Sequence, residues 1–165
     1  MKLTQYRLGC WTLLLCITLI QSATHAESVA VNFRGTLIEP PACTINGGQR
    51  IDIEFGNVRD ELIDGQNYIQ AINYQLNCPD APAPLILTLS IQGGLAEFDP
   101  TAVNTNLREL GIRVLHDGIP LEINTPIMLD ITRPPLLQAV PVKRNGTTLS
   151  PGRFAAVATL YAGYL

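Results

Sequence analysis

Short runs of alternating apolar and polar residues recur along this chain of 165 residues and constrain its fold more than any other feature. The clearest runs are 51–55, 72–78 and 85–92. Because successive side chains of a β-strand point to opposite faces, each run predicts a strand with one buried face. Turn signals separate the runs: Gly56-Asn57, Pro79, Gly93-Gly94, Asp117-Gly118 and Asn145-Gly146. The spacing predicts an all-β sandwich in a single domain.

Four further stretches complete this interpretation. Residues 112–123 place an Asp-Gly pair between alternating apolar positions and predict a hairpin. Residues 127–142 carry three prolines, Pro141 among them, so we expect an edge strand or a loop there. The last strand is expected to occupy 153–165. Only 101–110 has a composition that would suit a short helical turn.

The first 26 residues have the layout of a secretory signal peptide. Lys2 and Arg7 give a positively charged start, the apolar run 11–20 follows, and small and polar residues lead to Ala26, where we expect cleavage. The alternative is an uncleaved membrane anchor, for which the apolar run is short. We therefore expect a signal peptide at 1–26 and export of the rest of the chain.

Beyond this segment the chain carries few groups suited to catalysis or metal binding. It has one histidine, His116, two cysteines, Cys43 and Cys78, and no tryptophan. The acidic residues of 60–64 indicate a solvated loop, and the formal net charge of −3 disfavours nucleic-acid binding. Two cysteines in an exported chain predict one disulfide, the alternative being two buried thiols. We expect no enzymatic activity, no metal and no cofactor.

The region after the signal peptide begins with a run whose apolar residues occupy every second position. These residues are Val29, Val31, Phe33, Gly35 and Leu37. Pro40-Pro41 follows, and two consecutive prolines cannot continue a sheet ladder. We therefore expect a strand separated from the domain that follows. The alternative is an ordinary first strand of the same sandwich.

The C-terminal run has the same alternation but unusually small side chains. Its apolar face consists of Phe154, Ala156, Ala158, Leu160, Ala162 and Tyr164. Three alanines leave room for something bulky beside the strand, and no residue beyond Leu165 is available to pair with it. A free strand edge next to an apolar groove favours aggregation unless a partner covers it. Together, the two ends suggest that one copy donates a strand to its neighbour.

Five motifs in the same order resemble those of pilus subunits of the chaperone–usher class from Gram-negative bacteria. Gly152 is fourteenth from the end and Tyr164 is penultimate, with alternating apolar residues between them, as in the C-terminal signature of that family. The other four motifs are Asn32-Phe33-Arg34-Gly35-Thr36-Leu37, Pro40-Pro41-Ala42-Cys43-Thr44-Ile45-Asn46, Phe55-Gly56-Asn57-Val58 and Leu76-Asn77-Cys78.

This resemblance implies an immunoglobulin-like sandwich of six strands that lacks its seventh, which leaves a hydrophobic groove beside the C-terminal strand. It implies a signal peptide at 1–26, a donor-strand extension at 27–39 and a pilin domain at 40–165. The donated face would be Val29, Val31, Phe33, Gly35 and Leu37. The strand that binds the chaperone and lines the groove would comprise Gly152, Phe154, Ala156, Ala158, Leu160, Ala162, Tyr164 and Leu165.

The implied partners follow from the same family. In the periplasm a chaperone would lend a strand to the groove, and its basic residues would bind the carboxylate of Leu165. At an outer-membrane usher, the extension of the next subunit would replace that strand, and the chain would end in a fimbrium on the cell surface.

The motif around Cys43 most resembles the tip adaptor of P-type pili, which joins the adhesin to the fibre. A major shaft pilin of the same class is the nearest alternative. A small secreted carbohydrate-binding protein is a different class, and it would have to use Tyr68, Tyr161 and Tyr164 as sugar platforms.

Overall fold

The structure, a computed structural model, describes residues 28–37, 39, 42–79 and 85–165. The signal peptide expected at 1–26 lies outside the described residues. The chain divides into two units, 1–37 and 38–165. The described part of the first unit forms no helix or strand, and each of its residues is exposed. No helix among the described residues is both long and apolar enough to cross a membrane.

The second unit is built from short strands, as expected, but the run 72–78 is a strand only at Leu76–Asn77. The strands are β1 (Thr44–Ile45), β2 (Gln70–Ala71), β3 (Leu76–Asn77), β4 (Leu87–Gly93), β5 (Leu95–Ala96), β6 (Asp99–Asn104), β7 (Leu110–His116), β8 (Ile119–Pro120), β9 (Ile127–Met128), β10 (Leu137–Lys143) and β11 (Ala158–Tyr164). Two single 3-10 turns, η1 (Asn46–Gly48) and η2 (Asp60–Leu62), accompany them. The helical turn considered for 101–110 is wrong, because β6 and the start of β7 occupy that stretch.

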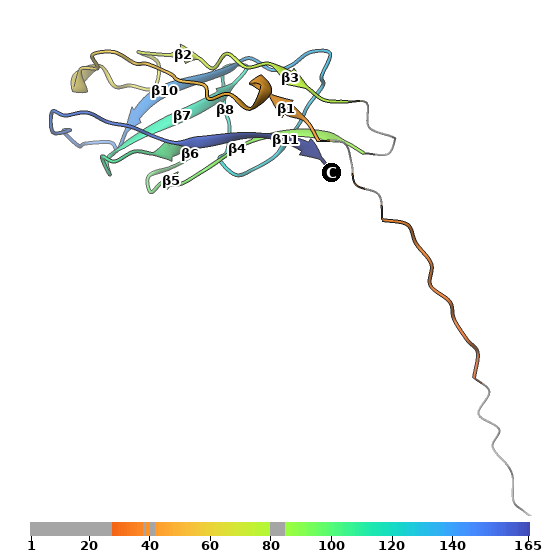
Figure 1. The fold of residues 1–165 in the computed structure, drawn as a ribbon. Helices are drawn as coiled ribbons and strands as arrows, with labels where there is room; N and C mark the ends of the chain where they lie inside the picture. The colour runs from red at the N-terminus through yellow and green to blue at the C-terminus, as the bar shows by residue number, and fades with distance from the viewer. Residues whose placement is uncertain (1–27, 38, 40–41, 80–84) are drawn as a thin grey trace, which may run out of the picture. The chain divides into compact units, whose positions relative to one another are not determined.

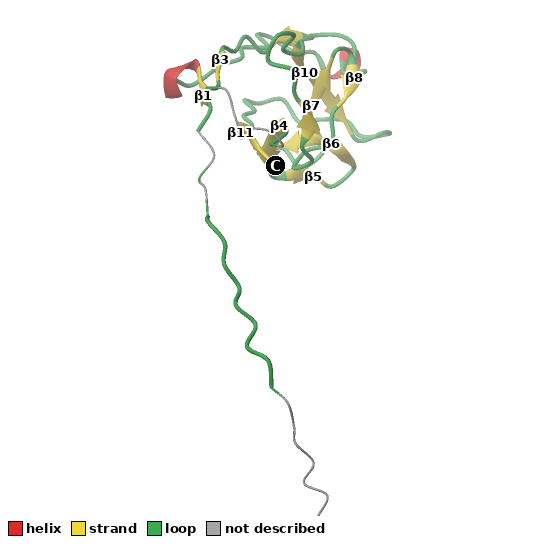
Figure 2. Ribbon diagram, turned by 90° about the vertical axis from the view of Figure 1, so that its right-hand side faces the viewer, coloured by secondary structure: helices red, strands yellow, loops and turns green. Residues whose placement is uncertain are grey.

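The strands form two main layers. The larger sheet has the order β2-β10-β7-β6-β5, with β8 pairing on β7, and the smaller has the order β11-β4-β9. All the ladders are antiparallel, and β1 and β3 form a separate pair. Figures 1 and 2 show β11 and β4 on one side of the sandwich and β10 and β7 on the other. The all-β sandwich expected from the sequence is confirmed.

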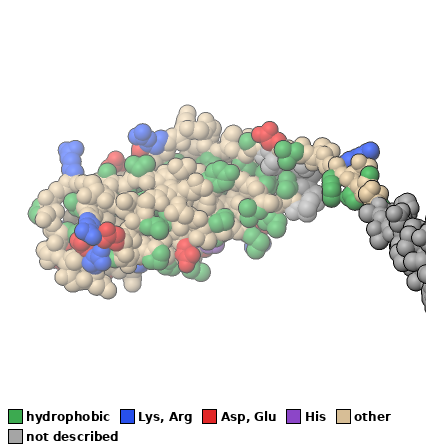
Figure 3. All heavy atoms as spheres, turned by 90° about the horizontal axis from the view of Figure 1, so that it is seen from below, with side chains coloured by type: hydrophobic (Ala, Val, Ile, Leu, Met, Phe, Trp, Pro, Cys, Tyr) green, Lys and Arg blue, Asp and Glu red, His purple; other side chains and the backbone are tan. Residues whose placement is uncertain are grey.

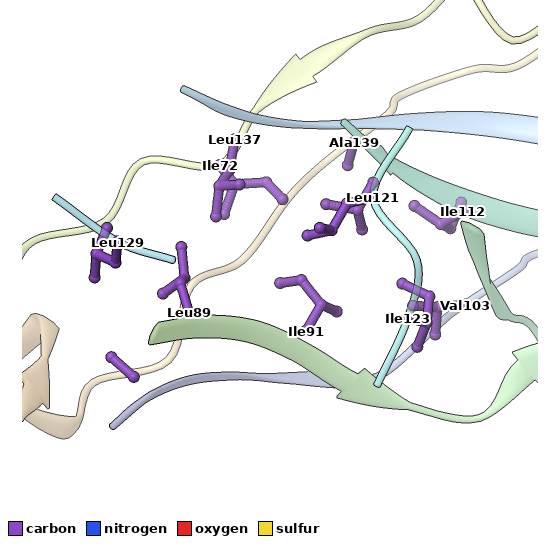
Figure 4. Packing of buried hydrophobic residues seen from close by; sticks show 12 residues of the cluster. Ile72, Leu89, Ile91, Val103, Ile112, Leu121, Ile123, Leu129, Leu137 and Ala139 are labelled. Carbon is purple, nitrogen blue, oxygen red and sulfur yellow. The ribbon is translucent and has the colours of Figure 1, made fainter. Parts of the chain in front are cut away.

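Aliphatic side chains from both layers fill the space between them. Figure 4 shows Leu89 and Ile91 of β4 pointing toward Leu137 and Ile112 of the larger sheet. Leu89 and Leu137 are almost completely buried. Because each such side chain contributes about 1.5–3 kcal/mol when it leaves water, this cluster is the main source of stability.

Two sequence predictions are confirmed in detail. The run 85–92 becomes β4, with Leu89 and Ile91 inside. The Asp-Gly pair forms the turn between β7 and β8, with positive φ of 50° at Asp117 and 82° at Gly118. Positive φ at both central residues is typical of the tight hairpin turn whose twist matches that of the strands.

The expectation of an edge strand or loop throughout 127–142 is wrong for its second half. β10 pairs with β7 along its whole length, including Pro141 opposite Ile112, and with β2 on its other side. The β2 pairing involves only Gln138 and Ala139 of β10. The far side of β10 therefore has no ladder partner at Pro141, where a residue without an N–H is tolerated.

The two cysteines after residue 26 form the expected disulfide. Cys43 and Cys78 are bonded, with their Cα atoms 4.2 Å apart. They flank the short β1–β3 pair, in which Thr44 lies opposite Asn77. Closing a loop of 35 residues stabilises the fold by about 3–4 kcal/mol in the chain-entropy treatment.

An ion pair is built into the outer face of the larger sheet. The guanidinium of Arg113 on β7 donates to the Asp99 carboxylate on β6 at 2.6 Å and 3.0 Å. Thr101 donates to the same carboxylate from its backbone N–H and its hydroxyl. Burial of Asp99 raises its pKa, but the hydrogen bonds from Thr101 and Arg113 outweigh burial, so the pKa lies below its usual range.

We predict that Asp99→Asn lowers the free energy of unfolding by about 1–3 kcal/mol at pH 7, because it removes the charge that Arg113 and Thr101 hold. The folded-state pKa of Asp99 is lowered, so this contribution is present above its unfolded pKa and is lost as the pH falls through the folded value. The difference in the free energy of unfolding between Asp99→Asn and the unmodified chain, measured by urea unfolding, should therefore become smaller at acidic pH. Glu97→Gln, at an exposed ion pair with Arg108, is the control and should change little. A constant difference at every pH would contradict this assignment.

Candidate functional site

β11 uses only one of its two edges. Along its whole length it pairs with β4, from Ala158 opposite Gly93 to Tyr164 opposite Leu87. Beyond Tyr164, Leu165 donates to the Ile86 carbonyl at 2.9 Å and accepts from the Ile86 N–H at 3.2 Å. On the other side no strand pairs with β11 in the part of the chain that the structure describes. That edge presents backbone N–H and C=O groups without a ladder partner.

The side chains of residues 51–55 alternate between half-buried and exposed as in a strand, but the backbone of this run does not pair with any strand that the structure describes. Ile51, Ile53 and Phe55 are half-buried against the core, and the two acidic residues between them are exposed. Residues 50–58 form no backbone–backbone hydrogen bond with any described residue. The predicted alternation is therefore confirmed, while the predicted strand is not formed because it lacks a partner.

The unpaired run faces the segment that leads into β11. The rings of Phe55 and Phe154 lie 6.1 Å apart, centroid to centroid. Between 53–63 and 148–154 lies a hollow of about 1030 Å³. Its apolar lining consists of Ile53, Phe55, Val58, Ile63, Leu107, Leu110, Leu149 and Phe154. Two segments without strand pairing thus border one hollow, whose lining combines these apolar side chains with charged ones such as Glu54, Arg59 and Glu61.

Other apolar side chains also reach the surface. Figure 3 shows hydrophobic side chains scattered over one face of the molecule, some of them near charged groups. Scattered apolar residues of this kind are normal on protein surfaces. The hollow differs because its apolar residues line one concave space beside unpaired backbone.

The structure spreads the predicted groove residues along this border. Gly152 and Phe154 line the hollow, Leu160 is half-buried and Ala162 is buried. Ala156 and Ala158, on the same face of the run, are exposed. Nothing among the described residues covers these two alanines well enough to bury them.

The expected last strand starts later than Arg153. Its ladder begins at Ala158, because β4 ends at the opposite residue, Gly93. Asn106 instead holds the preceding segment, donating from its side chain to the Arg153 carbonyl at 3.1 Å and accepting from the Ala155 N–H at 2.8 Å.

The end of β11 is fixed near the disulfide. The hydroxyl of Tyr164 donates to the carbonyl of Pro79 at 2.6 Å, directly after Cys78. The Leu165 side chain is 70% exposed. The last residue of the chain therefore lies at the surface while the residue before it is anchored.

The apolar residues predicted to form a donated face at 29–37 are exposed within their own unit. The exposed fractions of Val29, Val31, Phe33 and Leu37 are 80%, 67%, 91% and 99%. No described atom lies within 4 Å of the position that a side chain at Gly35 would take. This segment therefore exposes apolar surface that water disfavours.

Sequence reasoning missed part of the hollow and misjudged one acidic residue. Leu107 and Leu149 lie in loops without alternation, so no periodic signal identifies them as lining residues. Asp60 is not fully solvated, because Lys143 donates to its carboxylate at 2.7 Å and hydrogen bonding to Lys143 holds the Asp60 pKa below its usual range. Asp64 fits the loop prediction, and backbone N–H donors of Asn67 and Gln66 lower its pKa.

The tyrosines considered as sugar platforms have separate contacts. The Tyr68 hydroxyl accepts from the Arg59 N–H, and Tyr164 donates to Pro79. The hydroxyl of Tyr161 lies beside Gly163, 2.8 Å from the position that a Cβ atom would occupy if this residue had a side chain. The structure does not assemble these three side chains into one aromatic surface.

Comparison with known proteins gives a consistent result. The family model "Fimbrial protein" matches residues 31–164. The chain is 35% identical over 156 residues to the fimbrial-like protein YfcQ of Escherichia coli strain K12, covering 92% of this chain and 95% of that protein. It is 31% identical over 113 residues to the fimbrial adapter PapF of Escherichia coli, covering 67% of this chain and 64% of PapF.

Solved pilin structures share the fold. The P pilus adaptor subunit PapF matches with a TM-score of 0.55 at 22% identity, over 77% of this chain and 98% of that one. The P pilus rod subunit PapA matches with a TM-score of 0.57 at 20% identity, over 82% and 100%. The chain therefore belongs to the fimbrial protein family and is a structural, non-enzymatic subunit of chaperone–usher pili with an immunoglobulin-like fold.

Proposed function

We propose that this chain is the minor tip adaptor of its pilus and that it assembles by donor-strand exchange. In this proposal the unpaired border formed by 51–57 and β11 is the acceptor groove, and 27–39 is the donor extension. One observation carries the proposal: two unpaired segments border a hollow that is partly lined by apolar side chains, while the alternating apolar residues of 29–37 are exposed within their own unit.

The physical drive is strand addition. An inserted strand would give ladder partners to both unpaired edges and would cover Ala156 and Ala158. Each large donor side chain would contribute about 1.5–3 kcal/mol on leaving water. Gly35 would lie where the groove is narrowest, since it has no side chain to accommodate. The reaction needs no nucleotide, because the free energy is stored in the unpaired edges and exposed apolar faces.

The sequence relatives support the adaptor role over that of a shaft pilin. The chain is 38% identical over 111 residues to the minor fimbrial protein PrsF and 31% identical to the fimbrial adapter PapF, both of Escherichia coli. The fold does not discriminate, since the adaptor and rod structures match with similar TM-scores. An adaptor would insert its extension into the adhesin and receive the extension of the next subunit.

The same proposal includes the route to the surface. A signal peptide at 1–26 would direct export, and a periplasmic chaperone would fill the groove until the usher exchanges it for a donor. The exposed Leu165 supports this step, because a chaperone can reach the terminal carboxylate. Basic chaperone side chains would suit it through charge-assisted hydrogen bonds.

We predict that residues 39–165 gain stability when residues 27–38 are grafted after Leu165 through a short flexible linker. The grafted protein should be monomeric and should melt about 20 °C or more above residues 39–165 alone, because the groove is filled. The same graft with Phe33→Asp is the matched control and should lose most of the gain. If residues 39–165 already melt as cooperatively and as high, the sandwich is complete and the proposal is wrong.

A second measurement separates the adaptor from a shaft pilin. We predict that the purified chaperone complex of this chain, incubated alone, stays monomeric on a non-denaturing gel. Its own extension would fit an empty groove of this chain, but it would displace the bound chaperone strand from that groove only slowly, whereas an adaptor's extension exchanges readily with another subunit. A major shaft pilin under the same conditions should give a ladder of polymers. A ladder from this chain would leave donor-strand exchange intact and would assign the chain to the shaft.

A further inference from the structure

We infer that Asp60 and Lys143 form a clasp that holds the wall 53–63 of the hollow against the larger sheet, in the position in which a donor strand is taken up. This inference rests on the proposed function, because it gives these two residues a positioning role at the acceptor groove. The pair joins a loop in one wall to the larger sheet, and its two residues are 83 positions apart in the sequence.

The clasp has two hydrogen bonds. The Lys143 ammonium donates to the Asp60 carboxylate at 2.7 Å and to the Asp60 backbone carbonyl at 2.9 Å. Both side chains are largely sheltered, with exposed fractions of 20% for Lys143 and 23% for Asp60. A charge-assisted pair in this setting is less screened by solvent than the surface pairs of this chain.

Lys143 belongs to the larger sheet, so the clasp attaches the wall to a paired strand. Lys143 is the last residue of β10 and lies opposite Leu110 of β7. Leu110 is buried and lines the hollow. Asp60 begins η2 and belongs to the wall 53–63. The ion pair thus ties that wall to the strands beneath the hollow.

Apart from the packing of Ile53, Phe55 and Ile63, few hydrogen bonds with described residues fix the wall 53–63. Residues 50–58 form no backbone–backbone hydrogen bond with a described residue, and Arg59 uses its N–H for the Tyr68 hydroxyl. Neighbouring charges are engaged elsewhere: Arg144 pairs with Glu109 and Glu97. Without the clasp, the wall would have to be ordered during strand uptake, and that ordering opposes binding.

The test is the rate at which the chain of residues 27–165 takes up a fluorescein-labelled peptide of residues 27–38, followed by stopped-flow anisotropy. We expect Asp60→Asn and Lys143→Met each to slow association about tenfold, with the double variant no slower than either single one. Arg108→Met, at an exposed pair with Glu97 that does not line the hollow, is the control and should associate at the unmodified rate.

The outcomes separate the clasp from the proposed function. If the unmodified chain takes up no peptide, donor-strand exchange and the clasp both fail. If it takes up peptide and the clasp variants associate equally fast, only the clasp is refuted. Faster dissociation with unchanged association would show that the pair merely stabilises the filled groove, and would also refute it. Asp60→Asn keeps the side chain's shape, so it decides the result should Lys143→Met fail to fold.

Discussion

Backbone hydrogen bonding along one border of the sandwich is the constraint on which the rest depends. A buried or half-buried strand edge needs partners for its N–H and C=O groups, and among the described residues neither the free edge of β11 nor residues 50–58 have a ladder partner. The core between β4 and the larger sheet is closed nonetheless, with Leu89 and Leu137 almost fully buried. The fold is therefore closed at its centre and open along one side.

This combination explains how a subunit can be stable enough to exist and still be reactive. The disulfide between Cys43 and Cys78 and the anchored Tyr164 fix one end of the border, while Asp60 and Lys143 fix the other. Between these fixed ends, the exposed Ala156 and Ala158 leave room for a strand. The apolar face at 29–37 supplies a strand of matching chemistry, which in our proposal serves another subunit.

Local patterns in the sequence predict much of this arrangement. Alternation identifies β4 and the inward side chains of 51–55, and the Asp117-Gly118 pair predicts its hairpin, because these signals depend on neighbouring residues. Pro141 leads to the wrong expectation of an edge strand or loop, because its place in β10 depends on where the pairing with β2 stops. The expectation of a solvated loop is also wrong for Asp60, because its partner Lys143 is remote in sequence. Alternation at 51–55 likewise cannot reveal that no described strand pairs with this run.

Amide hydrogen exchange of residues 51–57 and β11, with and without a peptide of residues 27–38, tests the missing strand most directly. The account predicts rapid exchange of residues 51–57 in the chain alone and slowing by about a hundredfold or more when the peptide binds, while β7 and β10 change little. Protection of residues 51–57 before peptide is added would contradict it. So would peptide-induced protection confined to other parts of the sandwich.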